Sequence, residues 1–116
     1  MDDTLGDALD RLWQTIEARR GARPETSYTA SLLASGAVRV ARKLGEESLE
    51  AIIEAVNGDC EALTRESADV LYHLMVLWAA AGVTPDAIAA ELTRREGVSG
   101  LEEKRGRRRR QTDPAR

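Results

Sequence analysis

The sequence predicts an all-α protein, a helical bundle of four to five helices. Apolar residues recur at the three- and four-residue spacing of helices in several long stretches. No stretch has the pattern of a strand. Proline occurs only where a helix could begin or has already ended, at Pro24, Pro85 and Pro114. Long uninterrupted helices are therefore expected.

The first two predicted helices differ in length. Four apolar residues at helical spacing open the chain: Leu5, Leu9, Leu12 and Ile16. They predict a first amphipathic helix that ends before the sequence GARPE. The stretch SYTASLLAS, residues 27–35, predicts a short helix that is stopped or bent at Gly36.

Two long helices are predicted next, over residues 37–56 and 59–81. The first ends at Asn57 and Gly58, a common C-terminal signal. The second is apolar on almost every side over residues 70–81, as a central buried helix would be. Because the connection between them is so short, we expect an antiparallel helical hairpin.

A last helix is predicted from the sequence Thr84-Pro85-Asp86 to about Arg95. These residues supply an N-cap, a proline at the first helical position and an acid in the first turn. The sequence has neither an internal repeat nor a glycine-rich phosphate loop, so it favours neither a P-loop nor a dinucleotide fold.

Length and composition indicate one small domain. The chain has 116 residues, of which 42% are hydrophobic. Its single Cys60 cannot form an internal disulfide, and no apolar run reaches the roughly 20 residues that span a bilayer. The N-terminus lacks the basic start and apolar run of a signal peptide. We expect a cytoplasmic protein with no membrane contact.

The net charge of −3 is unevenly distributed. Residues 104–116 carry seven basic side chains against one acidic side chain, a net of +6, which leaves −9 for residues 1–103. Runs of like charge are typically solvated, so we expect an all-α domain over residues 1–103 and a basic, disordered tail over residues 104–116. An alternative is a helical interaction module whose tail binds nucleic acid. It is disfavoured because no aromatic residue is interleaved with residues 107–110.

Charged residues line one stripe on each of the two long predicted helices. The first stripe consists of Lys43, Glu47, Glu50 and Glu54. The second stripe consists of Glu66, Asp69 and His73. Residues three, four and seven apart share a helix face, so the hairpin would turn the two stripes toward each other. Four carboxylates would then converge: Glu47, Glu50, Glu66 and Asp69.

Converging carboxylates raise one another's pKa unless a cation neutralises them. All-oxygen ligation indicates a hard ion, Mg²⁺ or Mn²⁺. A di-iron site would need Glu-x-x-His pairs on two helices, whereas His73 stands seven residues from Glu66. A redox-inert ion favours a nucleotide pyrophosphatase, in which the metal neutralises charge on the leaving group. The alternative, solvated glutamates on exposed faces, we accept for Glu54 and Glu61.

The carboxylate pattern also resembles a known signature. Glu47-x-x-Glu50, followed after 15 residues by Glu66-x-x-Asp69, looks like the metal-binding signature of the all-α, MazG-like nucleoside triphosphate pyrophosphatase superfamily. Within it, four blocks are similar to the phosphoribosyl-ATP pyrophosphohydrolase family of histidine biosynthesis: SYTASLLASG (27–36), KLGEESLE (43–50), ESADVLYHLMVL (66–77) and SGLEEK (99–104).

The resemblance implies Mg²⁺-dependent hydrolysis of N1-(5-phosphoribosyl)-ATP to the corresponding AMP compound and pyrophosphate. It assigns the metal to Glu47, Glu50, Glu66 and Asp69. Glu46 and Glu47 are the candidate catalytic residues, with Glu46 either an extra ligand or the base that orients the attacking water. Two residues are candidates for substrate binding, Lys43 and His73. Lys43 would meet a phosphate oxygen or pair with Glu47, and His73 would contact substrate or be a satisfied core histidine.

The resemblance further implies a homodimer, in which the helices of two chains complete a larger bundle. Relatives are often fused to a cyclohydrolase domain, and we expect this chain to be the free-standing form. A rival interpretation keeps the metal site but makes the chain a house-cleaning pyrophosphatase of non-standard or excess nucleoside triphosphates. The SYTA and SGLEEK blocks favour the histidine pathway.

Overall fold

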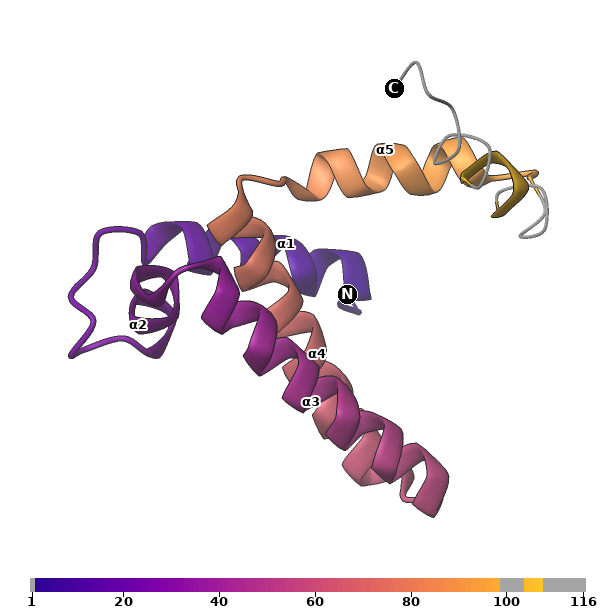
Figure 1. Ribbon diagram of the computed structural model, residues 1–116, viewed down its shortest axis with the longest axis horizontal. Coiled ribbons are helices and arrows are strands. Elements are labelled where there is room, and N and C mark those ends of the chain that lie inside the picture. Colours follow the sequence, from indigo (N-terminus) through magenta and orange to yellow (C-terminus); the bar gives the residue numbers. More distant parts are fainter. Residues whose placement is uncertain (1, 99–103, 108–116) are drawn as a thin grey trace. The chain divides into compact units, whose positions relative to one another are not determined.

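The computed structural model describes residues 2–98 and 104–107, and no β-strand occurs among them (Figure 1). The helices are α1 (Leu5–Ala18), α2 (Tyr28–Ser35), α3 (Ala37–Asn57), α4 (Cys60–Ala81) and α5 (Pro85–Arg95). Residues 104–107 add a short helical turn. The predicted all-α class is therefore confirmed. Most of the SGLEEK block and residues 108–116 of the predicted tail lie outside the described residues.

The chain divides into two compact units, Met1–Pro85 and Asp86–Arg116. The second unit carries most of α5, in which Glu91 pairs with Arg94 at 2.6 Å and with Arg95 at 3.2 Å. Hydrogen bonds from these two arginines lower the pKa of Glu91 to about 2. The first unit contains α1 to α4 and all the predicted site residues. The predicted division into residues 1–103 and a tail stays a prediction.

Helix α1 starts at a capping box and packs against α4. The Thr4 hydroxyl accepts a hydrogen bond from the Asp7 N–H at 3.0 Å, and the Asp7 carboxylate accepts one from the Thr4 N–H at 3.2 Å. At its other end, Arg20 donates a hydrogen bond to the Ala79 carbonyl oxygen at 2.6 Å. This bond ties the end of α1 to the last turn of α4.

Helix α2 is short because Gly36 interrupts the helical path. Gly36 has φ +88°, a backbone conformation that residues other than glycine rarely adopt. Helix α3 starts at the next residue. At the start of α2, the Ser27 hydroxyl accepts a hydrogen bond from the Ala30 N–H at 3.1 Å. The break at Gly36 was predicted from the sequence. Helix α2 contacts both α3 and α4.

Helices α3 and α4 form the predicted antiparallel hairpin and run side by side (Figure 1). Gly58 closes α3 in the left-handed conformation with φ +75°. Asp59 then caps α4, since its carboxylate accepts a hydrogen bond from the Ala62 N–H at 3.0 Å. Only these two residues separate the helices. Glu47 of the first stripe meets Glu66 and Asp69 of the second across this hairpin.

The core lies at one end of this hairpin. Its buried residues come from α1, α2, the start of α3 and the second half of α4: Ile16, Leu32, Val40, Met75, Val76 and Ala79. Trp13 and Trp78 pack against this cluster and are half-buried. The predicted carboxylates lie elsewhere on these two helices, in the middle of α3 and in the first half of α4, and none of them belongs to the core cluster.

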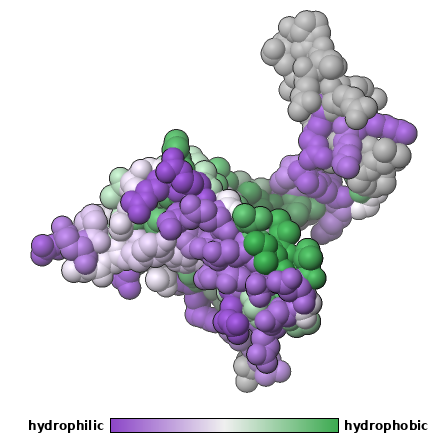
Figure 2. Space-filling model, turned by 60° about the horizontal axis from the view of Figure 1, so that its bottom comes forward, coloured by the Kyte–Doolittle hydropathy of each residue, from purple (hydrophilic) through white to green (hydrophobic). Residues whose placement is uncertain are grey.

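One face of α3 exposes apolar side chains to solvent. Four of them repeat at helical spacing: Leu49, Ile52, Ile53 and Val56. The last of these, Val56, is 82% exposed. Figure 2 shows open hydrophobic surface (green) beside hydrophilic surface (purple). No single helix in the described part of the chain is both long enough and apolar enough to cross a membrane.

Candidate metal centre

Three of the predicted ligands come together between α3 and α4. Glu47 on α3 and Glu66 and Asp69 on α4 each offer one carboxylate oxygen, and these oxygens lie within 4.8 Å of one another. Glu66 and Asp69 are three residues apart, which puts both on the face of α4 that meets α3. The short turn at Gly58 sets the register that brings Glu47 opposite them.

Glu66 is the most constrained member of this cluster. Its Oε2 atom is buried and has no hydrogen-bond partner among the described residues. Burial raises the pKa of Glu66 above its usual value, and the neighbouring carboxyl group of Glu50 raises it further. The negative charges of Asp69 and Glu47 act in the same direction. A buried carboxylate oxygen without a donor is a costly arrangement unless a cation approaches it.

The donor set fits a hard divalent cation. Carboxylate oxygens are the ligands that Mg²⁺ and Mn²⁺ prefer, and an ion there would give the orphaned Glu66 oxygen a partner. Glu50, the fourth predicted ligand, lies close enough to Glu66 to raise its pKa but is outside the group of three. Its side chain is exposed, so it can rotate toward an ion without unpacking the hairpin.

The two candidate residues that precede the cluster on α3 pair with each other. The Lys43 ammonium lies 3.6 Å from the Glu46 carboxylate, an i,i+3 ion pair with both side chains partly exposed. The pattern had suggested Glu47 as the partner of Lys43 if a pair formed. Lys43 pairs with Glu46 instead. The Glu47 carboxylate therefore belongs to the cluster with Glu66 and Asp69.

His73 is buried one turn beyond Asp69 on α4. It is only 5% exposed, and both of its ring nitrogens have partners. Nδ1 lies 2.8 Å from the Asp69 carbonyl oxygen, and Nε2 lies 3.3 Å from the Tyr28 hydroxyl. These contacts are those of a satisfied core histidine, one of the two roles considered for it. Substrate contact by His73 stays a prediction.

Sequence reasoning missed the aromatic side chains around His73. Tyr28 and Tyr72 stack with ring centroids 6.3 Å apart, and both rings meet His73 edge-on. The Tyr72 hydroxyl is 2.5 Å from the Thr29 hydroxyl. Neither tyrosine belongs to a charged stripe, so spacing gave no signal for them. Their presence in the SYTA and ESADVLYH blocks was the one available hint.

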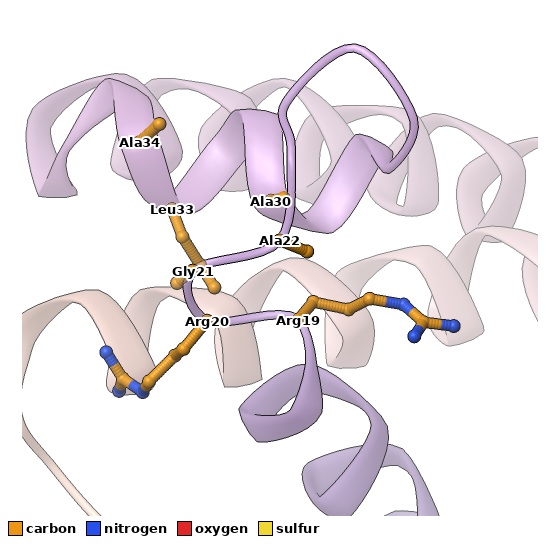
Figure 3. A pocket seen from close by; sticks show the side chains of 7 residues that line it. All are labelled: Arg19, Arg20, Gly21, Ala22, Ala30, Leu33 and Ala34. Atoms are coloured by element: carbon orange, nitrogen blue, oxygen red, sulfur yellow. The ribbon is translucent and has the colours of Figure 1, made fainter.

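A separate hollow lies between α2 and the turn that follows α1 (Figure 3). It has a volume of about 270 Å³, and the turn contributes Arg19, Arg20, Gly21 and Ala22 to its wall. The two guanidinium groups point in opposite directions in Figure 3. Arg20 pairs with Glu17 at 3.1 Å as well as with the Ala79 carbonyl, so its charge is engaged in the fold. None of the predicted site residues lines this hollow.

The fold and the carboxylate cluster define an all-α protein with a candidate cation site lined by carboxylate oxygens. Residues 9–96 match the protein family described as phosphoribosyl-ATP pyrophosphohydrolase. The chain belongs to this family, which confirms the assignment made from the four sequence blocks.

Known relatives carry the corresponding name. The chain is 58% identical over 99 residues to a phosphoribosyl-ATP pyrophosphatase of Azospirillum brasilense, an alignment that covers 85% of this chain and 89% of the relative. It is 59% identical over 99 residues to the phosphoribosyl-ATP pyrophosphatase of a Cereibacter sphaeroides strain, covering 85% and 96% of the two chains. A relative of the same name from Paracoccus denitrificans is also 59% identical, with 85% and 92% covered.

Proposed function

We propose that this protein hydrolyses N1-(5-phosphoribosyl)-ATP to N1-(5-phosphoribosyl)-AMP and pyrophosphate, the second step of histidine biosynthesis, in the cytoplasm. Family membership supports the substrate and the reaction. The observation that carries the chemistry is the buried Glu66 oxygen, which belongs to a cluster of three carboxylates and has no donor in the part of the chain that the structure describes. Such a cluster is suited to hold a cation against a polyphosphate.

Glu47, Glu66 and Asp69 would hold Mg²⁺, with Mn²⁺ as a substitute and with Glu50 completing the set. When bound, the ion neutralises charge on the phosphate oxygens and on the departing pyrophosphate. Helices α3 and α4 carry these carboxylates, and the two-residue turn between the helices brings Glu47 opposite Glu66 and Asp69. Burial of the Glu66 oxygen excludes water from one side of the site.

The Lys43–Glu46 pair supplies the remaining groups that hydrolysis needs. The Lys43 ammonium is placed to donate hydrogen bonds to a phosphate oxygen of the substrate. When it does so, it leaves Glu46, whose carboxylate oxygen is then available to accept the proton of the attacking water. Glu47 is the alternative base if its second oxygen remains outside the metal shell. In both cases the proton passes from water to a carboxylate oxygen of α3.

We propose that the protein works as a homodimer that pairs the exposed apolar face of α3. The face consists of Leu49, Ile52, Ile53 and Val56. Apolar residues at this spacing on an exposed helix are typical of a helix that packs against another. A second copy of α3 supplies a matching face, because a twofold interface uses the same patch on both chains.

The direct test is pyrophosphate release by the purified protein. The substrates are phosphoribosyl-ATP, ATP, dCTP and dUTP, each with Mg²⁺ and with EDTA. We expect release from phosphoribosyl-ATP alone, and we expect EDTA to abolish it. Release from a simple triphosphate instead would keep the carboxylate site but make the protein a house-cleaning nucleoside triphosphate pyrophosphatase. Release that survives EDTA would contradict the metal assignment.

A further inference from the structure

Tyr28 holds an orientation opposite to that of most partly exposed tyrosines. A tyrosine at a surface usually buries its ring and leaves its hydroxyl in water. Tyr28 is 53% exposed, yet its hydroxyl lies 3.3 Å from Nε2 of His73, which is only 5% exposed. The polar end of the side chain is thus directed into the protein, and part of its aromatic surface is left open to solvent.

The contacts of His73 define the direction of this hydrogen bond. Nδ1 of His73 faces the Asp69 carbonyl oxygen at 2.8 Å, and a carbonyl oxygen can only accept, so Nδ1 carries the ring hydrogen. Nε2 of the neutral ring then offers a lone pair, and the Tyr28 hydroxyl donates to it. The Tyr28 hydroxyl is therefore occupied by its hydrogen bond to His73. The part of Tyr28 that remains available to a ligand is the exposed surface of its ring.

A second set of contacts keeps this ring in place. Tyr72 stacks against Tyr28 with centroids 6.3 Å apart and planes inclined by 20°. The Tyr72 hydroxyl forms a hydrogen bond with the hydroxyl of Thr29, the residue next to Tyr28 on α2. Burial raises the pKa of Tyr72, so this hydroxyl keeps its proton at neutral pH. An aromatic side chain held from two sides loses little conformational entropy when it binds a ligand.

The Tyr28 ring is related to the carboxylate cluster through His73, whose ring centroid lies 6.2 Å from that of Tyr28. Its hydrogen-bond partner His73 lies four residues after Asp69 on α4, about 6 Å farther along the helix axis. His73 also shares the helix face of Glu66 and Asp69. A nucleotide whose phosphates meet a cation held by the carboxylates would extend its sugar and base away from them, and His73, farther along this face, contacts the Tyr28 hydroxyl.

We propose, on the basis of the proposed function, that Tyr28 is a substrate-binding residue that stacks on the purine ring of the nucleotide. Stacking recognises the flat face of the base and makes no distinction between its edges. Tyr28 would thus select for a base-bearing substrate over inorganic polyphosphate. Binding of the phosphate chain would depend on Lys43 and on the Mg²⁺ that the carboxylates would hold.

The test compares two ligands that differ in the base. Binding of AMP and of inorganic tripolyphosphate with Mg²⁺ is measured by NMR titration on the full chain and on three variants. The variants are Tyr28→Ala, Tyr28→Phe and, as a control, Leu5→Ala, which removes an exposed apolar side chain from α1. Circular dichroism verifies that each variant keeps its helices.

We expect Tyr28→Ala to weaken AMP binding by about 10- to 100-fold, the effect of losing one base–aromatic stack. Tyr28→Phe keeps most of the affinity because the ring remains, and Leu5→Ala leaves it unchanged. Binding of tripolyphosphate is the same in all four proteins. In turnover of phosphoribosyl-ATP, Tyr28→Ala raises KM more than it lowers kcat.

Two results would overturn the inference. One is AMP binding that is absent in the wild-type chain or unaffected by Tyr28→Ala. The other is an equal loss of AMP and tripolyphosphate binding, which would make Tyr28 a structural support of the whole site. Pyrophosphate release by the wild-type chain tests the proposed function separately. If the proposed function is wrong, the wild-type chain releases no pyrophosphate from phosphoribosyl-ATP, whatever effect Tyr28→Ala has on AMP binding.

Discussion

At the scale of single residues, Glu66 links the stability of the protein to its chemistry. Its carboxyl group has a raised pKa in the folded, metal-free chain, whereas in the unfolded chain the value is near 4.5. The folded state therefore holds the proton more tightly than the unfolded state. This contribution to the free energy of unfolding is fully present below pH 4.5 and is lost as the pH rises through the raised pKa.

Replacing Glu66 with glutamine should consequently stabilise the metal-free protein at neutral pH, where the wild-type carboxylate is held among like charges. The gain in melting temperature should shrink as the pH is lowered toward 4.5, because the wild-type carboxyl group then takes up its proton. Thermal unfolding monitored by circular dichroism between pH 4.5 and 8 measures both effects. A lower melting temperature of Glu66→Gln at pH 8 would refute the account.

The same substitution should remove activity and the response to metal. Glu66→Gln loses a ligand charge at constant side-chain volume, and Asp69→Asn does the same one turn later. We expect neither variant to release pyrophosphate or to gain melting temperature with Mg²⁺. Glu54→Gln is the matched control, since Glu54 lies on the same stripe of α3 outside the cluster. Full turnover in Glu66→Gln would exclude this carboxylate as a ligand.

The cluster residues could be predicted from sequence and the aromatic ones could not. Glu47, Glu66 and Asp69 lie on two consecutive helices, so helical spacing and one short turn are enough to bring them together. Tyr28 reaches His73 only because α2 bends back at Gly36 to contact α4. No periodicity in the sequence encodes where a bent helix docks. The Lys43–Glu46 pair was missed because both Glu46 and Glu47 lie within one helical turn of Lys43, at spacings of three and four residues that both allow an ion pair.

At the scale of helices, α3 contains a glycine with no evident structural role. Gly45 lies in mid-helix, and a Cβ atom added there would meet nothing within 4 Å. A glycine in mid-helix is often explained by another helix or a substrate that approaches its backbone closely. No such helix is found among the described residues, so Gly45 costs α3 stability without a packing benefit within the chain.

Gly45→Ala should therefore raise the free energy of unfolding by about 0.5–1 kcal/mol, the difference in helix propensity between the two residues. Urea denaturation of wild type and variant gives this difference, and Ser48→Ala on the next turn serves as a second propensity change for comparison. A loss of stability, or a raised KM with unchanged stability, would mean that a second chain or the substrate lies against position 45.

The helices themselves were predictable because the chain marks their ends. Gly58, Asp59 and Gly82 stand at the boundaries of α3 and α4 with the conformations or hydrogen bonds that stop or start a helix. Boundaries signalled in this way depend on local chemistry, so they can be read without knowledge of the tertiary structure. The packing of α1 on α4 has no such local signal and required the structure.

At the scale of the whole molecule, the exposed apolar face of α3 predicts association. We expect sedimentation velocity to show a dimer for the wild-type chain. Ile52→Asp places a charge in the centre of the face and should shift the protein to monomers, because an unpaired buried charge is strongly unfavourable. Leu5→Asp, at a similarly exposed position on α1, should leave the dimer intact. A monomeric wild type, or a dimer that tolerates Ile52→Asp, would contradict the assignment.

The hairpin turn at Gly58 also affects how this protein can change over evolutionary time. Its two helices carry the whole carboxylate cluster, whereas Tyr28 is delivered by a different segment between α1 and α3. The residues proposed to hold the metal and the residue proposed to stack on the base are thus encoded in separate stretches of the chain. On the roles proposed above, exchange of residues 19–36 would change how tightly a base is held, while the hairpin that carries the carboxylates is inherited unchanged.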